Sequence, residues 1–453
     1  MLSVVTSVET TARPTERIVS FSDALFAIAI TFLALDLAEV PESVINHEET
    51  VTSFLSSHID DFMVYAGTFL IVGFLWSRHH RIFRYVKERV PRLTWLNLLL
   101  LALVALLPYP AGIVRWGLGS GLALACLLVP FLVIALLLVA IWETALAKKL
   151  VIPEMPEGTR AYFRASLWST VAVLGLALAL ALVSWKLDSR ELCDVAALCG
   201  VLLIILPPLV HRRWPIPPQA IYRVPNAEAF VKAERAEAGF VLTSLEKIRN
   251  GSDLQRLTVF TDGVFAIAVT ILALQLHAPD SSTPVSNQAL IENIQSVPWI
   301  PYLSTFAFIG VYWVTHVRAF ESIIGADSIL IWLNIIFLLF VAVLPLPMEL
   351  VSRLQGDIPS LLFYLSILCL VSICLAAMRI YTVKTHELSK ERIDSARSRM
   401  AIARSIWVCA AFALGIALVA IFDNVWFSNI VLLLVLLRGP ILRRAYPDAP
   451  AEV

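Results

Sequence analysis

Apolar segments long enough to cross a lipid bilayer dominate this sequence and restrict its fold more than any other feature. A membrane-spanning helix needs about 20 mostly apolar residues. Twelve segments approach that length: 17–38, 62–84, 92–112, 118–147, 163–185, 192–210, 254–276, 298–320, 326–350, 360–384, 401–422 and 425–442. Hydrophobic residues make up 59% of the 453 residues and charged residues only 15%, whereas soluble domains contain about 45–50% and about 25%. We therefore predict an all-α integral membrane protein and not a large soluble helical protein.

The apolar segments form two series of six, and a polar motif at the start of each series marks the duplication. The stretch 17–31 recurs as 256–270, 239 positions later, with Arg-x3-Phe followed by Ser-Asp or Thr-Asp. Three further motifs recur at an offset of 237 positions: Trp76-x2-His79 with Trp313-x2-His316, Trp95-x-Asn97 with Trp332-x-Asn334, and Pro108-x-Pro110 with Pro345-x-Pro347. We divide the chain into a first six-helix repeat (1–211), a cytosolic linker (212–253) and a second six-helix repeat (254–453). Two such repeats joined end to end are parallel, with the same orientation in the membrane.

The distribution of lysine and arginine predicts how the chain is oriented. If both termini and the linker lie on one side of the membrane, that side carries nearly all of the 35 Lys and Arg residues. The opposite side then keeps only Arg115, Lys186, Arg190 and Arg353. Because positively charged loops stay in the cytosol, we expect a multi-pass protein with both termini cytosolic. No Asn-x-Ser/Thr sequence for N-glycosylation lies on the outer side, which favours a bacterial plasma membrane over an endosome or lysosome.

Several other classes of function find no support in the sequence. The formal net charge is zero, which gives no reason to expect a nucleic-acid partner. The six cysteines contain no CxxC pair and are typical of small buried hydrophobes, so we expect neither a metal site nor a cofactor. His79, His80 and His316 form no HExxH motif and no two-His-plus-carboxylate cluster, which argues against a membrane enzyme.

Each first helix places a carboxylate opposite an apolar stripe. At about 100° per residue, Asp23 lies opposite the stripe that contains Ile28, and Asp262 lies opposite the stripe that contains Ile267. An ionisable side chain inside a bilayer costs at least about 2.5–3.5 kcal/mol, so it is found where it has partners. We therefore expect one hydrogen-bonded cluster in each repeat, which fixes the first helix to its neighbours. The candidate members are Arg17, Ser22, Asp23, Trp76, His79 and Asn97 in the first repeat, and Arg256, Thr261, Asp262, Trp313, His316 and Asn334 in the second. The alternative is a proton relay or ion site at Asp23 and His79.

The duplicated motif resembles that of the endosomal and lysosomal potassium channel family of transmembrane protein 175, which includes bacterial relatives. The resemblance rests on Arg-x3-Phe-Ser/Thr-Asp at the start of a six-helix unit, with Phe21 and Phe260 at the aromatic position. It extends to Trp-x2-His in the second helix and Asn in the third, in both repeats. The second repeat has Thr261 where the first has Ser22, and this exchange keeps the hydroxyl group.

The resemblance implies a potassium-permeable cation channel without a TVGYG-type carbonyl filter, and no such sequence occurs in this chain. In the family the first helices line the pore, and the apolar residue five positions after the motif aspartate forms the constriction. Here those residues are Ile28 and Ile267. A narrow apolar ring is dry and closed, and a wider one wets and conducts. The further pore-lining candidates are Phe32 with Ile271, Leu35 with Leu274, and the hydroxyl-bearing Thr31 and Thr270. Ordinary helix packing is the alternative interpretation of each stripe.

The resemblance also implies an assembly. Single-repeat members are tetramers, so a chain with two repeats needs two copies to place four first helices around a pore, as a pseudo-fourfold homodimer. The expected partners are potassium ions, with other monovalent cations and protons as further candidates, and membrane lipid. The alternative function is a secondary transporter, because some transporters also contain two parallel six-helix repeats. Against it, the apolar stripe holds no charged residue at mid-membrane, and the loop between helices two and three lacks a Gly-x3-Asp-Arg type motif.

Overall fold

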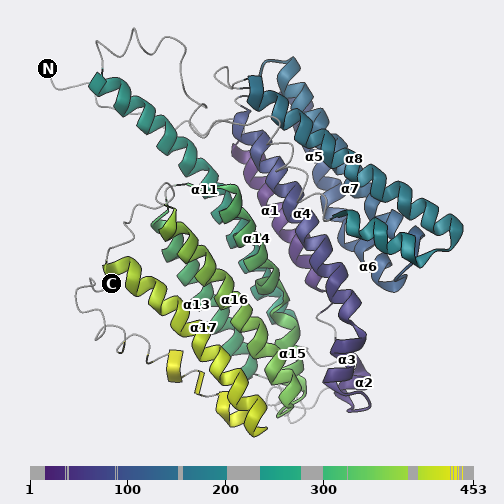
Figure 1. The fold of residues 1–453 in the computed structure, drawn as a ribbon, viewed down its shortest axis with the longest axis vertical. Helices are drawn as coiled ribbons and strands as arrows, with labels where there is room; N and C mark the ends of the chain where they lie inside the picture. The colour runs from purple at the N-terminus through teal and green to yellow at the C-terminus, as the bar shows by residue number, and fades with distance from the viewer. Residues whose placement is uncertain are drawn as a thin grey trace, which may run out of the picture. The chain divides into compact units, whose positions relative to one another are not determined.

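The computed structural model describes residues 16–35, 40–86, 90–151, 157–200, 235–276, 299–323, 325–385 and 396–428, together with residues 37, 88, 430–431, 433–435, 437 and 441. Every named element in these ranges is a helix (Figure 1). The elements are α1 (Glu16–Leu35), α2 (Glu42–Ile45), α3 (Val51–Ser57), α4 (Ile59–Tyr85), α5 (Pro91–Leu106), α6 (Pro108–Trp116), α7 (Gly121–Ala147), α8 (Glu157–Leu187), α11 (Arg235–Leu274), α13 (Trp299–Glu321), α14 (Ser328–Val343), α15 (Pro345–Arg353), α16 (Ile358–Lys384), α17 (Ala396–Phe422) and the 3₁₀ helix η2 (Val425–Phe427).

Ten stretches of the described chain are helical, long and apolar enough to cross a membrane. They are Arg17–Leu35, Ile59–Tyr85, Pro91–Trp116, Gly121–Ala147, Arg160–Leu187, Leu254–Leu274, Trp299–Glu321, Ser328–Arg353, Ile358–Lys384 and Arg399–Phe422. These stretches correspond to the first five spans predicted for each repeat. The sixth predicted spans, 192–210 and 425–442, lie partly outside the described residues. The predicted fold class is confirmed: the chain is an all-α integral membrane protein with two repeats.

The third span of each repeat is broken at the same place. In the first repeat α5 ends at Leu106 and α6 begins at Pro108, and in the second α14 ends at Val343 and α15 begins at Pro345. Proline is favoured at the first position of a helix because the N–H that it lacks would be unpaired there anyway, and its ring prevents the preceding helix from continuing. The duplicated Pro-x-Pro motif therefore accounts for the duplicated break.

The described chain forms two compact units, whose boundaries pass through α1 and α4. One unit comprises residues 1–26 and 74–235, and the other comprises residues 27–73 and 236–453. The start of α1 and the end of α4 thus belong to the first unit, together with α5 to α8. The remainder of α1 and α4 belongs to the second unit, together with α13 to α17. As a result, the polar residues singled out in each repeat lie within a single unit.

In the first unit α7 packs against α8, α5 and α6. Its residue Trp142 is fully buried, and the centre of its ring lies 5.4 Å from that of Phe163 on α8. The start of α7 also comes very close to α8, because a Cβ atom placed on Gly121 would lie 2.3 Å from the backbone oxygen of Ala181. Only glycine fits at such a contact. Aromatic packing near one end of the helix pair and a glycine contact near the other thus hold α7 against α8.

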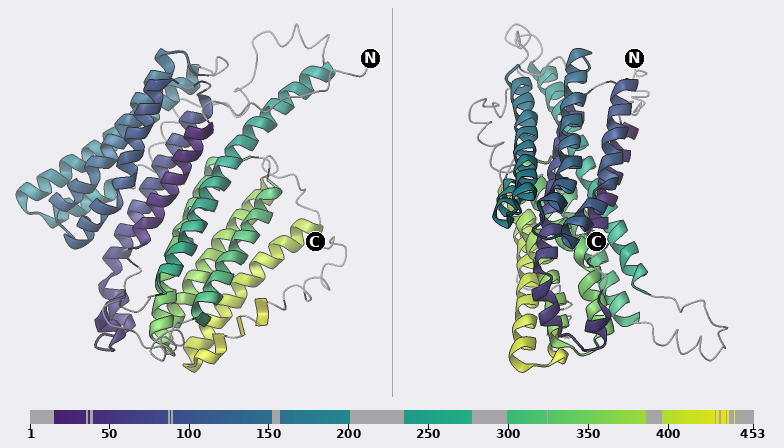
Figure 2. Two further views of the ribbon diagram at one scale, coloured as in Figure 1. Left: turned by 180° about the vertical axis from the view of Figure 1, so that it is seen from behind. Right: turned by 90° about the vertical axis from the view of Figure 1, so that its right-hand side faces the viewer.

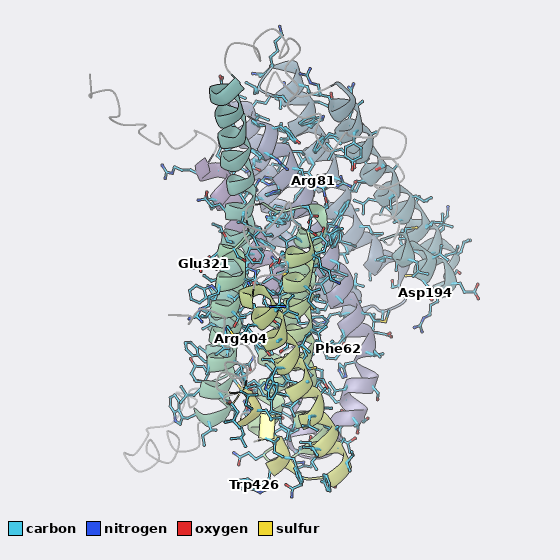
Figure 3. All side chains as sticks on the ribbon, turned by 60° about the vertical axis from the view of Figure 1, so that its left-hand side comes forward. Phe62, Arg81, Asp194, Glu321, Arg404 and Trp426 are labelled. Atoms are coloured by element: carbon cyan, nitrogen blue, oxygen red, sulfur yellow. The ribbon has the colours of Figure 1, made fainter. Side chains whose placement is uncertain are left out.

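In the second unit α16 packs against α17 and α14, and these helices run side by side in the green to yellow part of Figure 2. Buried hydroxyl groups in this unit have partners: Thr305 and Tyr364 lie 2.8 Å apart, and the Tyr312 hydroxyl donates to the backbone oxygen of Leu368 at 2.8 Å. Such pairing removes most of the free-energy cost of burying a hydroxyl. Figure 3 labels Arg404 near the start of α17 and Trp426 beyond its end.

Candidate functional site

The first candidate site is a chain of buried hydrogen bonds that joins α1, α4 and α5. Trp76 Nε1 on α4 donates to Asp23 Oδ1 on α1 at 2.9 Å. His79 Nε2, one turn further along α4, lies 2.8 Å from Asn97 Oδ1 on α5. The other end of the same amide, Asn97 Nδ2, donates to Ser22 Oγ on α1 at 3.0 Å. All five side chains are buried. Three helices are thus connected by side-chain hydrogen bonds where α1 begins.

The second repeat builds the same chain of hydrogen bonds between α11, α13 and α14. Trp313 Nε1 donates to Asp262 Oδ1 at 2.8 Å. His316 Nε2 lies 3.0 Å from Asn334 Oδ1, and Asn334 Nδ2 donates to Thr261 Oγ1 at 2.8 Å. Thr261 therefore does what Ser22 does in the first repeat, because only the hydroxyl group is used. The same contacts in two repeats of one chain indicate that this arrangement belongs to the fold of the repeat.

The hydroxyl group sets the direction of each chain of hydrogen bonds. Ser22 Oγ donates to the backbone oxygen of Ile18 at 2.8 Å, and Thr261 Oγ1 donates to that of Leu257 at 2.8 Å. The hydroxyl oxygen is then an acceptor for the Asn side-chain amide, whose own oxygen must accept from the histidine ring. In this arrangement the histidine carries a hydrogen on Nε2. Along each chain of hydrogen bonds, every donor therefore meets an acceptor.

Aromatic side chains enclose both histidine rings. The centre of the His79 ring lies 4.5 Å from that of Phe83 and 5.7 Å from that of Phe26. The His316 ring stacks on Phe320 at 3.9 Å and on Phe337 at 5.6 Å. Packing between aromatic side chains fixes the orientation of each ring, so both histidines are held in place by their neighbours as well as by the asparagine.

The two motif arginines and the two motif phenylalanines occupy unlike positions in the two repeats. Arg17 and Phe21 are exposed in the single chain, whereas Arg256 and Phe260 are buried. Arg17 lies outside the chain of hydrogen bonds that joins α1, α4 and α5. The structure therefore brings together Ser22, Asp23, Trp76, His79 and Asn97, and their counterparts, but does not place Arg17 among them.

The apolar stripe of α1 is exposed in the single chain, on the side away from the buried cluster. Ile28 is 42% exposed and Phe32 is 43% exposed, and Leu35 is half-buried. Thr31 is buried, and its hydroxyl donates within the helix, to Ala27 at 2.8 Å. Exposed large apolar residues at a spacing of three and four form a face that another helix or a pore can meet.

The corresponding face of α11 is less uniform. Ile267 is half-buried and Leu274 is exposed, but Ile271 is only 2% exposed and belongs to the core of its unit. Thr270 is exposed, and its hydroxyl donates to the backbone oxygen of Ile267 at 2.8 Å. The predicted layer of Phe32 and Ile271 therefore contains one exposed and one buried side chain in the single chain.

A glycine lets the two first helices approach each other. A Cβ atom on Gly263 of α11 would lie 2.9 Å from Cβ of Ala27 on α1, within one compact unit. Contacts this short are essentially limited to glycine, because a larger side chain would push the helices apart. The first repeat has Ala24 at the matching position. The pair of first helices is thus in direct contact within one chain.

The sequence did not reveal a difference in exposure between the two clusters. Trp76 is 0% exposed, whereas Trp313 is 41% exposed. Asp23 is buried, whereas Asp262 is exposed, although both carboxylates make the same hydrogen bond. Nothing in the motif distinguishes the two copies, so no sequence signal pointed to this difference. The described residues contain no group of three or more His, Cys, Asp or Glu side chains that could hold a metal ion.

Comparison with known proteins finds the same family model in both repeats. The family model for the endosomal/lysosomal potassium channel TMEM175 matches residues 17–108 and 256–345. The first match covers spans one and two and α5 of the third, and the second match covers the same parts of the second repeat, so each match contains one complete hydrogen-bonded cluster. The resemblance expected from the motif is confirmed in both repeats.

Individual relatives include bacterial and vertebrate channels. A potassium channel of Streptomyces collinus is 34% identical over 130 residues, which cover 28% of this chain and 62% of the relative. The endosomal/lysosomal proton channel TMEM175 of Danio rerio is 26% identical over 77% of this chain and 66% of the relative, and that of Homo sapiens is 26% identical over 73% and 64%. The chain thus spans less than two thirds of the length of these relatives. The crystal structure of a lysosomal potassium-selective channel TMEM175 homolog from Chamaesiphon minutus, 24% identical, covers 42% of this chain and 98% of that chain with a TM-score of 0.35.

Proposed function

Because both repeats of this chain match the family of the endosomal/lysosomal potassium channel TMEM175, we propose that the protein is a potassium-permeable cation channel. Ions cross the membrane passively, along a pore lined by the first helix of each repeat. The observation that carries the proposal is that the two sides of α1 have different surroundings. On one side Asp23 and Ser22 accept buried hydrogen bonds from Trp76 and Asn97, and the other side exposes the apolar residues Ile28 and Phe32.

The constriction of the proposed pore is a ring of isoleucines, Ile28 and Ile267. Next to it lie the layers of Phe32 with Ile271 and of Leu35 with Leu274, with Thr31 and Thr270 at the edge of the stripe. The exposure of Ile28 and Phe32 in the single chain supports this assignment for α1. For Ile271, which is buried in the single chain, pore lining requires that its side chain turn toward the axis when the pore assembles. An apolar ring gates by wetting and dewetting and needs no bound cofactor.

The pore is completed by a second copy of the chain. One chain supplies two first helices, α1 and α11, and a homodimer supplies four in a pseudo-fourfold arrangement. The exposed Asp262 and Trp313 support this assembly. A carboxylate that faces lipid inside a bilayer costs about 2.5–3.5 kcal/mol, so an exposed Asp262 within a membrane span requires protein or water beside it. A second copy would cover this pair in the way that Trp76 and Asp23 are covered in the single chain.

The proposed topology follows the distribution of positive charge. Both termini lie in the cytosol. The linker 212–253, which joins the channel repeat at 1–211 to the one at 254–453, also lies in the cytosol. Residues 212–234 of this linker lie outside the described residues, and α11 begins at Arg235. The proposed site is the plasma membrane of a bacterium, which agrees with the bacterial potassium channels among the relatives.

Reconstitution into liposomes tests the proposed function. With a potassium gradient and a second monovalent cation on the other side, the purified chain is expected to conduct, with a reversal potential shifted toward the potassium equilibrium value. The same preparation with a pH gradient in place of the potassium gradient is used to measure proton permeation, for which the vertebrate relatives are named. Saturating uptake of a solute without electrical conductance would support the secondary transporter and overturn the channel. A reversal potential that follows the proton gradient alone would overturn potassium as the main permeant ion.

The oligomeric state gives a second prediction. In mild detergent the native mass is expected to be twice the 50.2 kDa of the chain, because two copies are needed to complete the pore. Trp313→Ala removes a large side chain from the proposed contact surface and is expected to shift the equilibrium toward single chains. Trp95→Ala is the matched control, since Trp95 is 72% exposed on α5 and takes no part in the cluster. Dimers that dissociate equally in both variants, or single chains in the wild type, would contradict the proposed assembly.

A further inference from the structure

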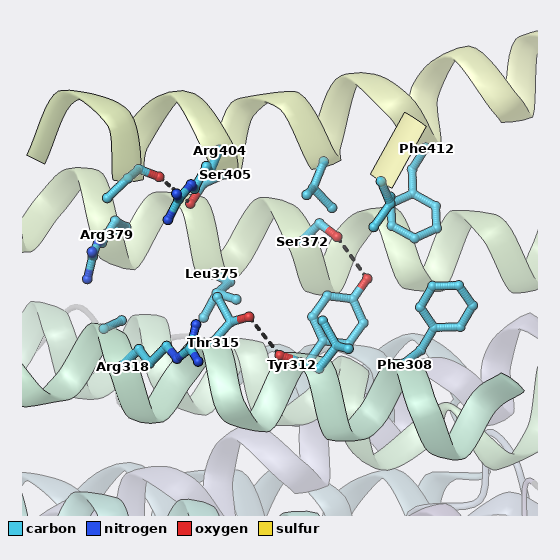
Figure 4. Close-up of a pocket in the computed structure, with 15 residues that line it drawn as sticks. Phe308, Tyr312, Thr315, Arg318, Ser372, Leu375, Arg379, Arg404, Ser405 and Phe412 are labelled. Carbon is cyan, nitrogen blue, oxygen red and sulfur yellow. Dashed lines mark hydrogen bonds between the residues drawn. The ribbon is translucent and has the colours of Figure 1, made fainter. Parts of the chain in front are cut away.

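A cavity of about 120 Å³ lies between α13, α16 and α17, within the second compact unit (Figure 4). Phe308 of α13 and Phe412 of α17 line one end of it, with their ring centres 6.1 Å apart. The ring of Tyr312 comes next along α13. Leu375 of α16 and Val408 of α17 add aliphatic surface. This end of the cavity is therefore walled by aromatic and aliphatic side chains.

Each hydroxyl group among the described residues that line the cavity is hydrogen-bonded within the protein. The Tyr312 hydroxyl donates to the backbone oxygen of Leu368 at 2.8 Å and lies 2.8 Å from Ser372 Oγ. The hydroxyls of Thr315 and Ser405 donate to backbone oxygens one turn earlier in their own helices, at 2.6 and 3.2 Å. A water molecule stays in a cavity only where it finds several polar partners. The hydroxyl groups therefore require neither water nor a polar ligand.

The arginine residues at the other end of the cavity are engaged as well. Arg318, Arg379 and Arg404 come from three different helices, and each has an interaction partner of its own. A charged ligand would have to compete with these partners, and a charge buried without an opposite charge is costly. The lining therefore favours a neutral ligand.

The volume of the cavity limits the size of that ligand. An apolar cavity of about 150 Å³ stays dry and takes up one benzene molecule. The cavity between α13, α16 and α17 is of similar size, so it admits a molecule with a single ring and is too short for the whole acyl chain of a membrane lipid. Val311, at its edge, is 44% exposed, so a ligand can enter from outside the bundle.

We propose that this cavity binds one small neutral aromatic molecule, about the size of a single benzene ring. The ligand lies among Phe308, Tyr312 and Phe412, where edge-to-face contacts between rings add to the burial of apolar surface. Side chains around a void lack the contacts that a filled core provides, so the ligand stabilises the packing of α13 against α16 and α17. Because α13 also carries Trp313 and His316, the ligand supports the helix to which α11 is hydrogen-bonded. The site does not depend on which ion the channel carries.

Binding of fluorobenzene to the full-length chain in detergent, followed by fluorine NMR, tests the proposal. One molecule per chain is expected to bind in a saturable way, apart from the pool that dissolves in the micelles. Benzene is expected to displace it, and cyclohexane to do so roughly two- to tenfold less well because it lacks the contacts between rings. Benzoate is expected not to displace it, because its charge would be buried without a partner. Fluorobenzene confined to the micelles, or displaced by cyclohexane, benzoate or the long alkane dodecane as well as by benzene, would overturn the proposal.

A pair of substitutions on α17 tests whether fluorobenzene binds in this cavity. Val408→Phe fills the cavity with a side chain of the protein and is expected to lower the affinity about tenfold or more, because no space for a second ring remains. Leu414→Phe adds the same ring at an exposed position of α17 outside the lining and is expected to leave the affinity unchanged. Ala401→Leu, at another position in the lining, is a second filling variant with a smaller change. Unchanged affinity in either filling variant would contradict the proposal. If neither variant folds, the displacement series on the wild-type chain decides.

Discussion

Replacing Ile28 and Ile267 together by asparagine is expected to raise the resting potassium conductance by about tenfold or more. In the proposed pore these residues form an apolar ring that is dry when it is narrow. An amide in each ring position attracts water and lowers the barrier to a hydrated ion, and a fall of about 1.4 kcal/mol in that barrier gives a tenfold rise in rate. Because Ile28 is 42% exposed in the single chain, its replacement leaves no cavity inside that chain. The measurement is current per channel protein in planar bilayers.

A volume-conserving variant is the control for this experiment. Ile28→Leu with Ile267→Leu keeps the ring apolar, and swaps of this kind usually cost less than about 1.5 kcal/mol in stability, so its conductance is expected to stay near that of the wild type. Leu99→Asn places an amide on an exposed position of α5 and is expected to have no effect on conductance. Unchanged current in the double asparagine variant, at equal protein level, would place the constriction elsewhere.

The fold followed from the sequence to a large extent, because membrane spans leave a strong signal. Apolar length alone placed the first five spans of each repeat. The third span of each repeat was predicted as one continuous segment, and the structure breaks it at the duplicated Pro-x-Pro motif, between α5 and α6 and between α14 and α15. The polar residues stood out because each recurs at a fixed offset. Their contacts within one repeat could be anticipated because a buried polar group needs a partner.

The order of the hydrogen bonds could not be read from the sequence. That Asn97 joins His79 to Ser22, while Trp76 reaches Asp23, depends on the rotation of α4 and α5 about their axes. A helical wheel gives the direction of a side chain but not what lies opposite. For the same reason it places Ile271 on the stripe of Ile267, whereas the structure buries Ile271 in its unit.

Differences between the two repeats were also hidden from the sequence. Trp76 and Trp313 belong to the same motif, yet one is buried and the other is 41% exposed, because exposure depends on what surrounds each repeat.

Removing the asparagine that joins the histidine to the hydroxyl group, Asn97 in the first repeat or Asn334 in the second, is expected to destabilise that repeat strongly. Asn97→Ala leaves His79 Nε2 without its acceptor and Ser22 Oγ without its amide donor, with all three residues buried. Each buried group that loses its partner costs about 1–3 kcal/mol. A loss of 1 kcal/mol lowers the melting temperature by about 2–4 °C in a domain of 150–250 residues, so a fall of several degrees is expected. Asn334→Ala is expected to lower the melting temperature by a similar amount. Thr94→Ala on α5 is the control.

A paired replacement distinguishes a structural cluster from a proton relay. His79→Phe with Asn97→Leu removes both polar partners, and Ser22 keeps its bond to the backbone oxygen of Ile18. Removing both partners of a buried hydrogen bond can be nearly neutral, so the double variant is expected to melt closer to the wild type than Asn97→Ala does. It is also expected to keep its conductance between pH 5 and pH 8, where an unperturbed histidine titrates. If His79 only anchors α1, apolar side chains that hold the helix in place can replace it without a change in current. Loss of pH-dependent current together with restored stability would therefore show instead that His79 carries protons.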